Sequence, residues 1–199
     1  MNLADAAAWK SYFWPGSEIL RNRLGIRDAE KLAEAEALLT NQRLEEGVPA
    51  APVTPDGYRS IHRFIFQDIY DWAGEYRTTN MRHPNHAALF CKAEFIAAQM
   101  TLVFDPLRAQ PLGSLANLDA FTFSLAKPMS DLNAIHPFRE GNGRAMRVFI
   151  DQFARSHGYR FDQTKLDPAQ WNEASRLSFI NADAGHMRPV LLQGLTRLE

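Results

Sequence analysis

One short stretch of this chain gathers the side chains that a site for a magnesium-bound polyphosphate would need. It runs from His136 to Arg147 and reads HPFREGNGRAMR, with a base that titrates near neutrality, a carboxylate, two glycines and three arginines. Such a site requires a proton acceptor, a metal ligand, close backbone approach and fixed positive charge. Each residue type alone is common in loops and on helix surfaces, but their combination at this spacing predicts a catalytic loop.

The expected position of this loop favours anion binding. Helical patterns end near Ile135 and resume at Gly141 or Asn142, so the loop would lead into a helix N-terminus. Unpaired backbone N–H groups and the positive end of the helix dipole attract anions at that point. Gly141 and Gly143 lack Cβ atoms, so the backbone could come close to phosphate oxygens.

The polar side chains of the loop have complementary candidate roles. Arg144 and Arg147 are three positions apart and would project from one face of the first helical turn. Glu140 is a candidate Mg²⁺ ligand, because this ion takes one or two carboxylates together with substrate oxygens. His136 is the candidate general base. Phe138 is expected to point into the core and hold the loop in place.

The elements that must position this loop are mostly helical. Helical patterns occur at 28–45, 58–72, 92–104, 118–135, 142–156, 168–180 and 187–198. In the first of them, an apolar stripe is formed by Leu32, Ala35, Leu38 and Leu39. Asp28 is a candidate N-cap and Gly47 a candidate stop. Residues 75–90 show no helical period and contain turn signals, which predicts a short β-hairpin. The fold class is therefore mainly α.

The first 27 residues differ from the rest of the chain. They are aromatic and irregular, with Trp9, Tyr12, Phe13 and Trp14 before a Pro-Gly turn. We expect residues 1–27 to form an N-terminal arm laid over the core, or alternatively an arm that docks a partner. Residues 28–199 are expected to form a single domain.

Composition indicates a cytoplasmic protein that does not bind membranes or nucleic acid directly. Hydrophobic residues make up 46% and charged residues 23% of the chain, and the formal net charge is -1. Such a charge provides no global attraction to nucleic acid or to a membrane surface. Cys91 is the single cysteine, which excludes an internal disulfide. We find neither a secretory signal nor an apolar run of the roughly 18 residues that span a bilayer.

The stretch from His136 to Arg147 matches in full the signature HxFx(D/E)GNGRxxR of the Fic (filamentation induced by cAMP) family, which the chain therefore resembles. Residues 65–77, which read IFQDIYDWAGEYR, are similar to the helix that leads into the family's flap, and the flap itself would be 78–90. The resemblance spans about 28–195 and is strongest in 58–158. It implies the Fic fold, a compact helical bundle with a short β-hairpin flap over the active site.

The resemblance implies an activity, the transfer of AMP from ATP to a Ser, Thr or Tyr hydroxyl of a target protein. His136 would then deprotonate the hydroxyl, and Glu140 would coordinate Mg²⁺. The 141–143 segment, with the side chain of Asn142, would hold the α-phosphate. Arg144 and Arg147 would bind the β- and γ-phosphates.

In the family, an extended target segment pairs with the edge of the flap, a form of β-augmentation. The residues expected to contribute are Thr78, Thr79, Asn80, Met81 and Phe90. The tip here, 82–86, departs from the Lys-Gly type expected for the family. It contains His83 and His86, which without a third ligand do not predict a zinc site. Arg139 lies outside the signature and is expected to be a surface or target contact.

Many Fic proteins are inhibited by a helix bearing (S/T)xxxE(G/N), whose glutamate pairs with the second arginine, here Arg147. The chain offers only a near match, Glu46-Gly47 preceded by Gln42. The resemblance therefore implies that a separate small antitoxin supplies this helix and that the chain is the toxin of a toxin–antitoxin pair. Type II topoisomerase subunits are among the family's targets. The alternative context is the Fic domain of an effector delivered into another cell.

Two other classes of function stay open. One is a Fic-fold transferase that moves another phosphate-containing group, such as UMP, phosphocholine or phosphate. The glycine at 141 argues against phosphate transfer, because relatives with that activity carry a lysine there. The other is a binding module without catalysis, which would need neither His136 nor Glu140.

Overall fold

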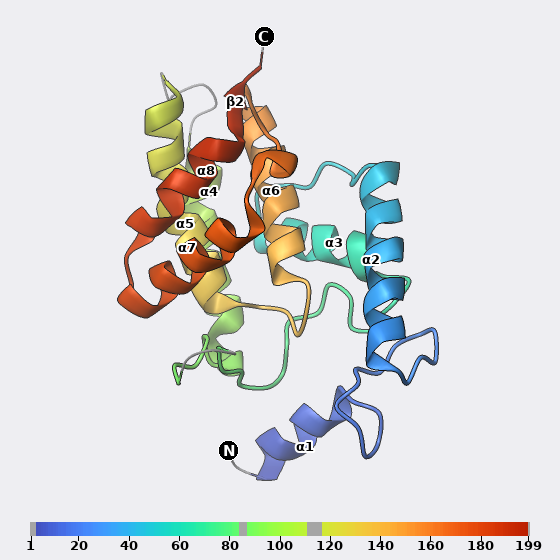
Figure 1. Cartoon of the computed structure of the whole chain (residues 1–199). Helices are drawn as coiled ribbons and strands as arrows, with labels where there is room; N and C mark the ends of the chain where they lie inside the picture. Colours follow the sequence, from blue (N-terminus) through green and yellow to red (C-terminus); the bar gives the residue numbers. More distant parts are fainter. Residues whose placement is uncertain (1–2, 84–86, 111–116, 199) are drawn as a thin grey trace.

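The computed structural model describes residues 3–83, 87–110 and 117–198, and in these the chain is mainly helical, as expected (Figure 1). The helices are α1 (Leu3–Ser11), α2 (Ala29–Glu46), α3 (Pro55–Phe66), α4 (Ile96–Ala109), α5 (Leu118–Ile135), α6 (Asn142–Ser156), α7 (Pro168–Asn181) and α8 (Met187–Gly194). Short 3₁₀ turns are η1 (Ala93–Phe95), η2 (Gln163–Lys165) and η3 (Ala184–His186). The strands β1 (Tyr159–Phe161) and β2 (Leu195–Arg197) form a two-stranded antiparallel sheet.

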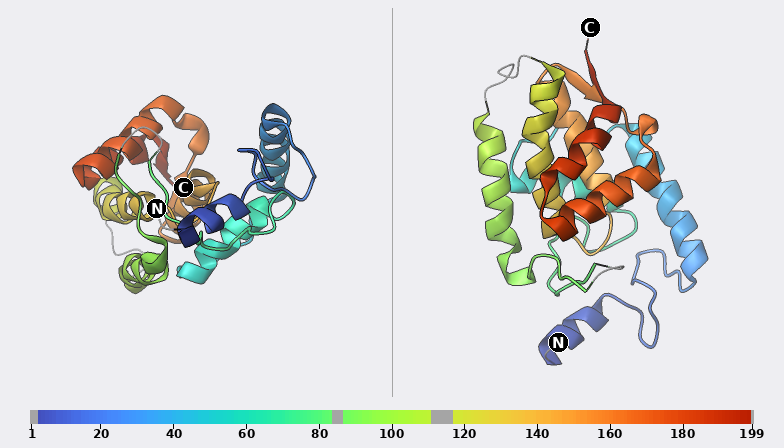
Figure 2. Two further views of the ribbon diagram at one scale, coloured as in Figure 1. Left: turned by 90° about the horizontal axis from the view of Figure 1, so that it is seen from below. Right: turned by 60° about the vertical axis from the view of Figure 1, so that its left-hand side comes forward.

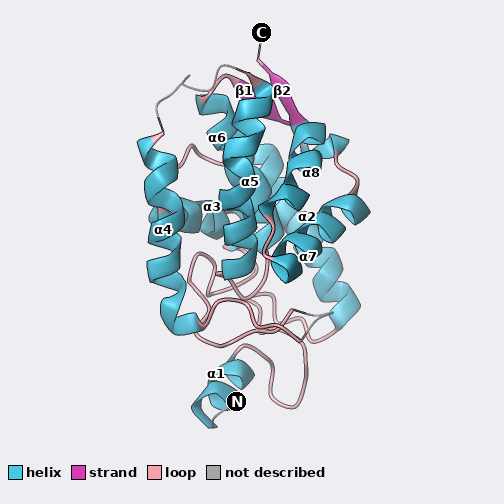
Figure 3. Cartoon of the chain, turned by 90° about the vertical axis from the view of Figure 1, so that its left-hand side faces the viewer, coloured by secondary structure: helices cyan, strands magenta, loops and turns pink. Residues whose placement is uncertain are grey.

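Helix α5 is at the centre of the bundle and packs against α4, α6, α7 and α8 (Figure 3). Helix α3 packs against α6 and also against α2. Fully buried side chains such as Ile65, Phe104, Phe121 and Leu125 make this core continuous. Phe138 of the catalytic loop joins them, as expected. The end of α5 and the start of α6 are thus held by close packing, which positions the loop between them.

The expected boundaries of α2 are confirmed, and its expected apolar stripe is confirmed in part, because Leu32 is buried and Leu39 packs against the core. Asp28 caps the helix by accepting the Lys31 N–H, and Gly47 ends it with a φ of 87°. Leu38, however, is 70% exposed. Leu32 and Thr40 are the buried residues of α2, and Glu36 lies between them on the same face, so a carboxylate and a hydroxyl share the inward side of this helix.

Helix α3 ends earlier than the sequence predicted. The expected helix ran to residue 72, but Phe66 is its last residue and turns follow. The chain folds back so that the backbone of Gly74, with a φ of 81°, comes close to α3. A Cβ at this position would lie 2.8 Å from Cβ of Arg63. The segment after Gly74 then reaches the catalytic loop, where the Arg77 N–H donates to the Pro137 carbonyl at 2.8 Å.

The final helix is also shorter than expected, because 195–197 form β2 rather than a last helical turn. Strand β2 pairs with β1 in the register Tyr159↔Arg197 and Phe161↔Leu195. A Cβ at Gly194 would lie 2.5 Å from the Phe161 ring. The absent side chain therefore lets the two segments meet.

The N-terminal arm contains a helix that the sequence did not predict, α1, at the end of the molecule opposite to β2 (Figure 2). Ile19, Leu20 and Ile26 of the arm pack against the core, and the Arg23 N–H donates to the carbonyl of Ile69 at 2.8 Å. No helix in the described part of the chain is long and apolar enough to cross a bilayer.

Candidate active site

His136 ends helix α5 in an unusual backbone conformation. Its φ is 48° and its ψ is 62°, and its N–H donates to the Leu132 carbonyl at 3.0 Å. A left-handed conformation is strained for a residue with a Cβ and persists only where the surroundings hold it. It turns the chain sharply out of α5 into the loop.

The His136 imidazole is suited to accept a proton. It stacks on the Phe90 ring, with 4.0 Å between the ring centroids and 11° between the planes. Burial, and then the nearby Arg77 cation, lower its pKa to about 4, although the Asn133 carbonyl opposes the shift. The imidazole is therefore neutral at physiological pH, which is the state that a general base needs.

Asn142 closes the catalytic loop on itself. Its side-chain oxygen accepts the Phe138 N–H and its side-chain amide donates to the Phe138 carbonyl, both at 2.9 Å. Asn142 was expected to hold an α-phosphate, and these two bonds take one amide N–H and one lone pair of the amide oxygen. The two bonds give the loop its shape, and Asn142 lines the cavity together with Gly143.

Gly141 is the N-cap of α6 and has a φ of 82°. A Cβ here would lie 2.2 Å from two carbons of the Phe66 ring. This glycine therefore serves close packing of α6 on α3 and does not line the cavity described below. Of the two glycines expected to approach phosphate, Gly143 lines the cavity and Gly141 does not.

Glu140 presents its carboxylate at the cavity, with 44% of the side chain exposed. One carboxylate oxygen accepts the Gly141 N–H at 2.9 Å and lies 3.6 Å from the Arg144 guanidinium. A single exposed carboxylate fits Mg²⁺, which fills most of its coordination shell with water and substrate oxygens.

A buried histidine that the sequence analysis did not single out, His62, forms a hydrogen bond to the backbone of Glu140. Nδ1 of His62 accepts the Gly74 N–H at 2.9 Å, so that Nε2–H donates to the Glu140 carbonyl at 2.9 Å. Its ring stacks on Phe138 at 3.8 Å. Burial lowers the pKa of His62 to about 3. The neutral ring thus joins α3, the turn at Gly74 and the catalytic loop.

The two arginines in the first turns of α6 have different surroundings. Arg144 forms an ion pair with Glu36 of α2, donates to the Thr40 hydroxyl at 3.3 Å and lies over the Phe66 ring. Arg147 lines the cavity, and the described residues offer it no carboxylate, only the side-chain oxygen of Gln163 at 3.3 Å. Arg147 is therefore the arginine whose charge is available to an anion in the cavity.

These residues surround a cavity of about 570 Å³ between the catalytic loop, the flap and α7. Of the expected site residues, the cavity brings together His136, Glu140, Asn142, Gly143, Arg147, Met81 and Phe90. Helix α7 adds Asn172 and Arg176, which sequence reasoning missed, and Arg176 is paired with Glu173 at 2.6 Å. Arg144 lines a neighbouring cavity of about 520 Å³, which it shares with Arg147.

The expected hairpin is present as a single antiparallel bridge between Arg82 and Leu89. The Phe90 N–H donates to the Met81 carbonyl at 3.0 Å, and the His83 N–H donates to the Ala88 carbonyl at 3.1 Å. His86 lies outside the described residues, and the His83 ring stacks on Phe179.

Among the remaining flap residues, Thr78 is exposed, and its N–H donates to the Tyr12 hydroxyl. Thr79 and Phe90 are buried, and Asn80 accepts the Ala93 N–H at 3.0 Å. Of the five flap residues expected to contribute to target binding, Met81 and Phe90 line the cavity and Thr78 is exposed.

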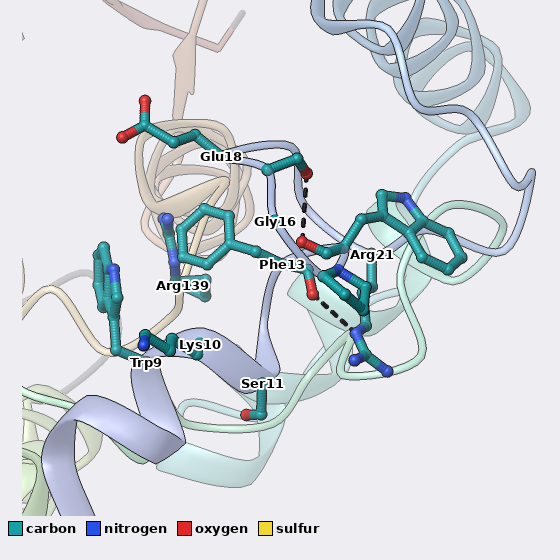
Figure 4. A pocket seen from close by; sticks show the side chains of 11 residues that line it. Trp9, Lys10, Ser11, Phe13, Gly16, Glu18, Arg21 and Arg139 are labelled. Carbon is teal, nitrogen blue, oxygen red and sulfur yellow. Dashed lines mark hydrogen bonds between the residues drawn. The ribbon is translucent and has the colours of Figure 1, made fainter. Parts of the chain in front are cut away.

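Arg139, expected at the surface or against a target, is covered by the N-terminal arm. Its guanidinium lies 4.6 Å from the Trp9 ring and 5.1 Å from the Phe13 ring. Figure 4 shows Arg139 beside these two rings. A cavity of about 1080 Å³ opens beside this contact, between Trp14 and Arg21. Arg139 lines this cavity and the catalytic one, so the arm contacts the catalytic loop directly.

The near match to an inhibitory motif lies at the end of α2. Glu46 pairs with Arg43 at 2.8 Å and accepts a hydrogen bond from Gln42 at 3.3 Å. Within the described residues it makes no ion pair with Arg147, the contact that an inhibitory glutamate would need.

Comparison with known proteins identifies the family of this chain. The model of the Fic/DOC family matches residues 52–154. Probable protein adenylyltransferase y4lH of Sinorhizobium fredii is 37% identical over 167 residues, which cover 83% of this chain and 86% of that protein. Probable protein adenylyltransferase Fic of Escherichia coli K12 is 34% identical over 170 residues, covering 83% and 82%.

A solved structure shows the same fold at lower identity. It is that of BepC from Bartonella tribocorum, a VirB-translocated effector protein with bound AMPPNP. It matches with a TM-score of 0.86 and 21% identity over 96% of this chain and 98% of that one. The resemblance inferred from the sequence is thereby confirmed, and this chain belongs to the Fic/DOC family.

Proposed function

We propose that this protein is an adenylyltransferase that transfers AMP from Mg-ATP to a Ser, Thr or Tyr hydroxyl of a target protein. Its relatives named protein adenylyltransferase are 37% and 34% identical over most of the chain. The observation that carries the proposal is the position of the neutral His136 imidazole at the same cavity as Glu140 and Arg147.

In the proposed reaction, His136 accepts the proton of the incoming hydroxyl while the hydroxyl oxygen attacks the α-phosphorus of ATP. The bond from the α-phosphorus to the bridging oxygen breaks, and pyrophosphate leaves in line with the attack. Arg147 and the N-terminus of α6 neutralise the charge that develops on the phosphates. The fixed loop supplies orientation, so that the reacting groups need not be ordered during the reaction.

Glu140 would hold Mg²⁺ against the α- and β-phosphates, and the bound ion would withdraw charge from their oxygens. The Gly141 N–H and Arg144 hold the carboxylate near this position through one of its oxygens. Removing the Glu140 carboxylate should therefore weaken the dependence of ATP binding on Mg²⁺.

Within the loop, the backbone of 142–143 would contact the α-phosphate, since the Asn142 side chain is bonded to Phe138. Arg147 would bind the β- and γ-phosphates. Arg144 would also bind these phosphates only if its ion pair with Glu36 were broken. In the present arrangement this ion pair joins α2 to α6.

The proposal is tested with ATP labelled at either the α- or the γ-phosphate, incubated with a cell lysate. Wild type should label a protein from the α position only, whereas His136→Ala should lose labelling by about 100-fold or more. ATP binding, measured by calorimetry, should be kept in His136→Ala, because the imidazole acts on the hydroxyl. Label from the γ position would identify phosphate transfer, and label from UTP would identify UMP transfer.

We further propose that the protein acts in the cytoplasm as the toxin of a toxin–antitoxin pair. The support is that Arg147 has no carboxylate partner in the described chain, while Glu46 is bonded to Arg43 and Gln42. A separate antitoxin with an (S/T)xxxE(G/N) helix would supply the missing glutamate to Arg147. Adding such a protein should abolish labelling by wild type. Continued labelling in a stable complex would contradict this role.

A type II topoisomerase subunit is the proposed target. Purified subunits should accept the α-phosphate label from wild type and not from His136→Ala. If the lysate band proves to be another protein and the purified subunits stay unlabelled, this choice of target is wrong, while the proposed reaction stands.

A further inference from the structure

Arg77 is a buried cation between the flap and the catalytic loop. It is 2% exposed, and burial lowers the pKa of its guanidinium to about 10, so the group stays charged at neutral pH. In the described part of the chain, no carboxylate forms an ion pair with it. Burying an unpaired charge is expensive, so a fold that retains one must satisfy its hydrogen-bond donors in another way.

Backbone carbonyls satisfy this guanidinium, and they come from two separate segments. On the flap side, Nη1 donates to the Thr79 carbonyl at 2.6 Å and Nη2 donates to the Cys91 carbonyl. On the catalytic side, Nε donates to the His136 carbonyl at 2.8 Å and Nη2 donates to the Ile135 carbonyl at 3.0 Å.

The backbone of Arg77 also contacts the loop, because its N–H donates to the Pro137 carbonyl at 2.8 Å. The residue therefore binds three consecutive positions of the chain, 135–137, at the point where His136 adopts its left-handed conformation. The same side chain holds the flap on both sides of its bridge.

We propose that Arg77 is a positioning residue that sets the distance between the flap edge and the His136 imidazole, and so aligns a target hydroxyl with that base. The proposal rests on the proposed function. If a target segment pairs with the flap backbone, the flap determines where the hydroxyl lies. The link through Arg77 then determines whether the imidazole is within reach of it.

The planar fork of arginine is needed for this arrangement. Its donors point in fixed and different directions and can reach carbonyls on two segments at once. A lysine would keep the charge, but its three donors lie on one nitrogen. Arg77→Lys should therefore keep the electrostatics of the site while loosening the link between flap and loop.

The first test compares Arg77→Lys with Arg63→Lys. Arg63 forms an exposed ion pair with Glu75 at 2.7 Å, next to the same turn but away from the cavity. With the lysate substrate and α-labelled ATP, Arg77→Lys should lower the rate at saturating ATP by about 10- to 100-fold. The KM for ATP should change by less than about 3-fold, and Arg63→Lys should match wild type. An equal loss in ATP binding and turnover would overturn the positioning role.

The second test uses hydrogen exchange and does not depend on transfer activity. In folded Arg77→Lys, confirmed by circular dichroism, amides of the flap (78–83 and 87–91) and of 135–138 should exchange faster, while those of α4 and α8 stay protected. Unchanged flap exchange would overturn the proposal. Because this test needs no target, it still decides the role of Arg77 if wild type labels no protein and the proposed function fails.

If Arg77→Lys does not fold, the wild-type protein supplies the test. Segments coupled through Arg77 should open together, so the slowest amides of the flap and of 135–138 should share one opening free energy. A flap that opens far more readily than 135–138 would show that Arg77 does not couple them.

Discussion

The substitution Gly141→Ala tests how the catalytic loop is packed. Gly141 has a φ of 82°, and a Cβ there would lie 2.2 Å from carbons of the Phe66 ring. Phe66 is fully buried, stacks on His62 and lies under the Arg144 guanidinium, so it has little room to move. The alanine should therefore push the start of α6 away from α3.

The magnitude follows from two contributions. A left-handed conformation costs an alanine about 1–2 kcal/mol. Inserting a methyl group into a filled core costs about 1–3 kcal/mol more. Gly158→Ala measures the backbone cost without the packing cost, because the φ of Gly158 is 80° but a Cβ there would meet nothing within 4 Å. We expect the free energy of unfolding to fall by about 2–5 kcal/mol in Gly141→Ala. In Gly158→Ala it should fall by about 1–2 kcal/mol.

Urea denaturation of both variants measures the difference, and a double-mutant cycle identifies its source. Phe66→Leu combined with Gly141→Ala should recover at least about 1 kcal/mol relative to the sum of the single changes. Equal destabilisation at Gly141 and Gly158, or strict additivity with Phe66→Leu, would refute the argument that the ring excludes a side chain at 141.

Three other perturbations test the supports of the site. Asn142→Ala leaves the Phe138 N–H and carbonyl unpaired and should lower the free energy of unfolding by about 2–4 kcal/mol in urea, whereas a loss below 1 kcal/mol would mean that water replaces the amide. Glu36→Gln removes the carboxylate that neutralises an arginine of α6 and should lower the thermal midpoint, corresponding to about 1–3 kcal/mol; an unchanged midpoint would show that the ion pair is not stabilising. The pKa values of His62 and His136 are lowered from 6.5 to about 3 and about 4, so the unfolded chain binds protons that the folded protein does not. Stability should be full above about pH 6.5 and fall as the pH drops toward 4, and urea midpoints that stay constant between pH 7 and 5 would contradict these shifts.

Much of the site was predictable from the sequence because its residues are close neighbours along the chain. The segment from His136 to Arg147 is one loop and the first turns of one helix, so spacing alone places its groups near one another. The main helices were also predictable, since amphipathic periodicity and capping residues such as Asp28 act locally. These features require no knowledge of which helix packs on which.

The tertiary structure decided which side chains of that segment face the cavity. Glu36 lies on the inward stripe of α2, one turn after Leu32, and only the packing of α2 beside α6 brings it to Arg144. That contact leaves Arg147 as the arginine available to an anion. Likewise, the closeness of Phe66 to Gly141 depends on α3 lying against α6.

Arg77 and His62 depend still more on the fold, because each joins segments that are far apart in the sequence. Arg77 reaches carbonyls 58 and 59 positions away, and His62 reaches a carbonyl 78 positions away. Hydrogen bonds to backbone carbonyls leave no signature in the residue types of their acceptors, so no sequence pattern predicts them. The sequence by itself determined the chemistry of the loop, and the packed helices determined its shape, its supports and the direction of each charge.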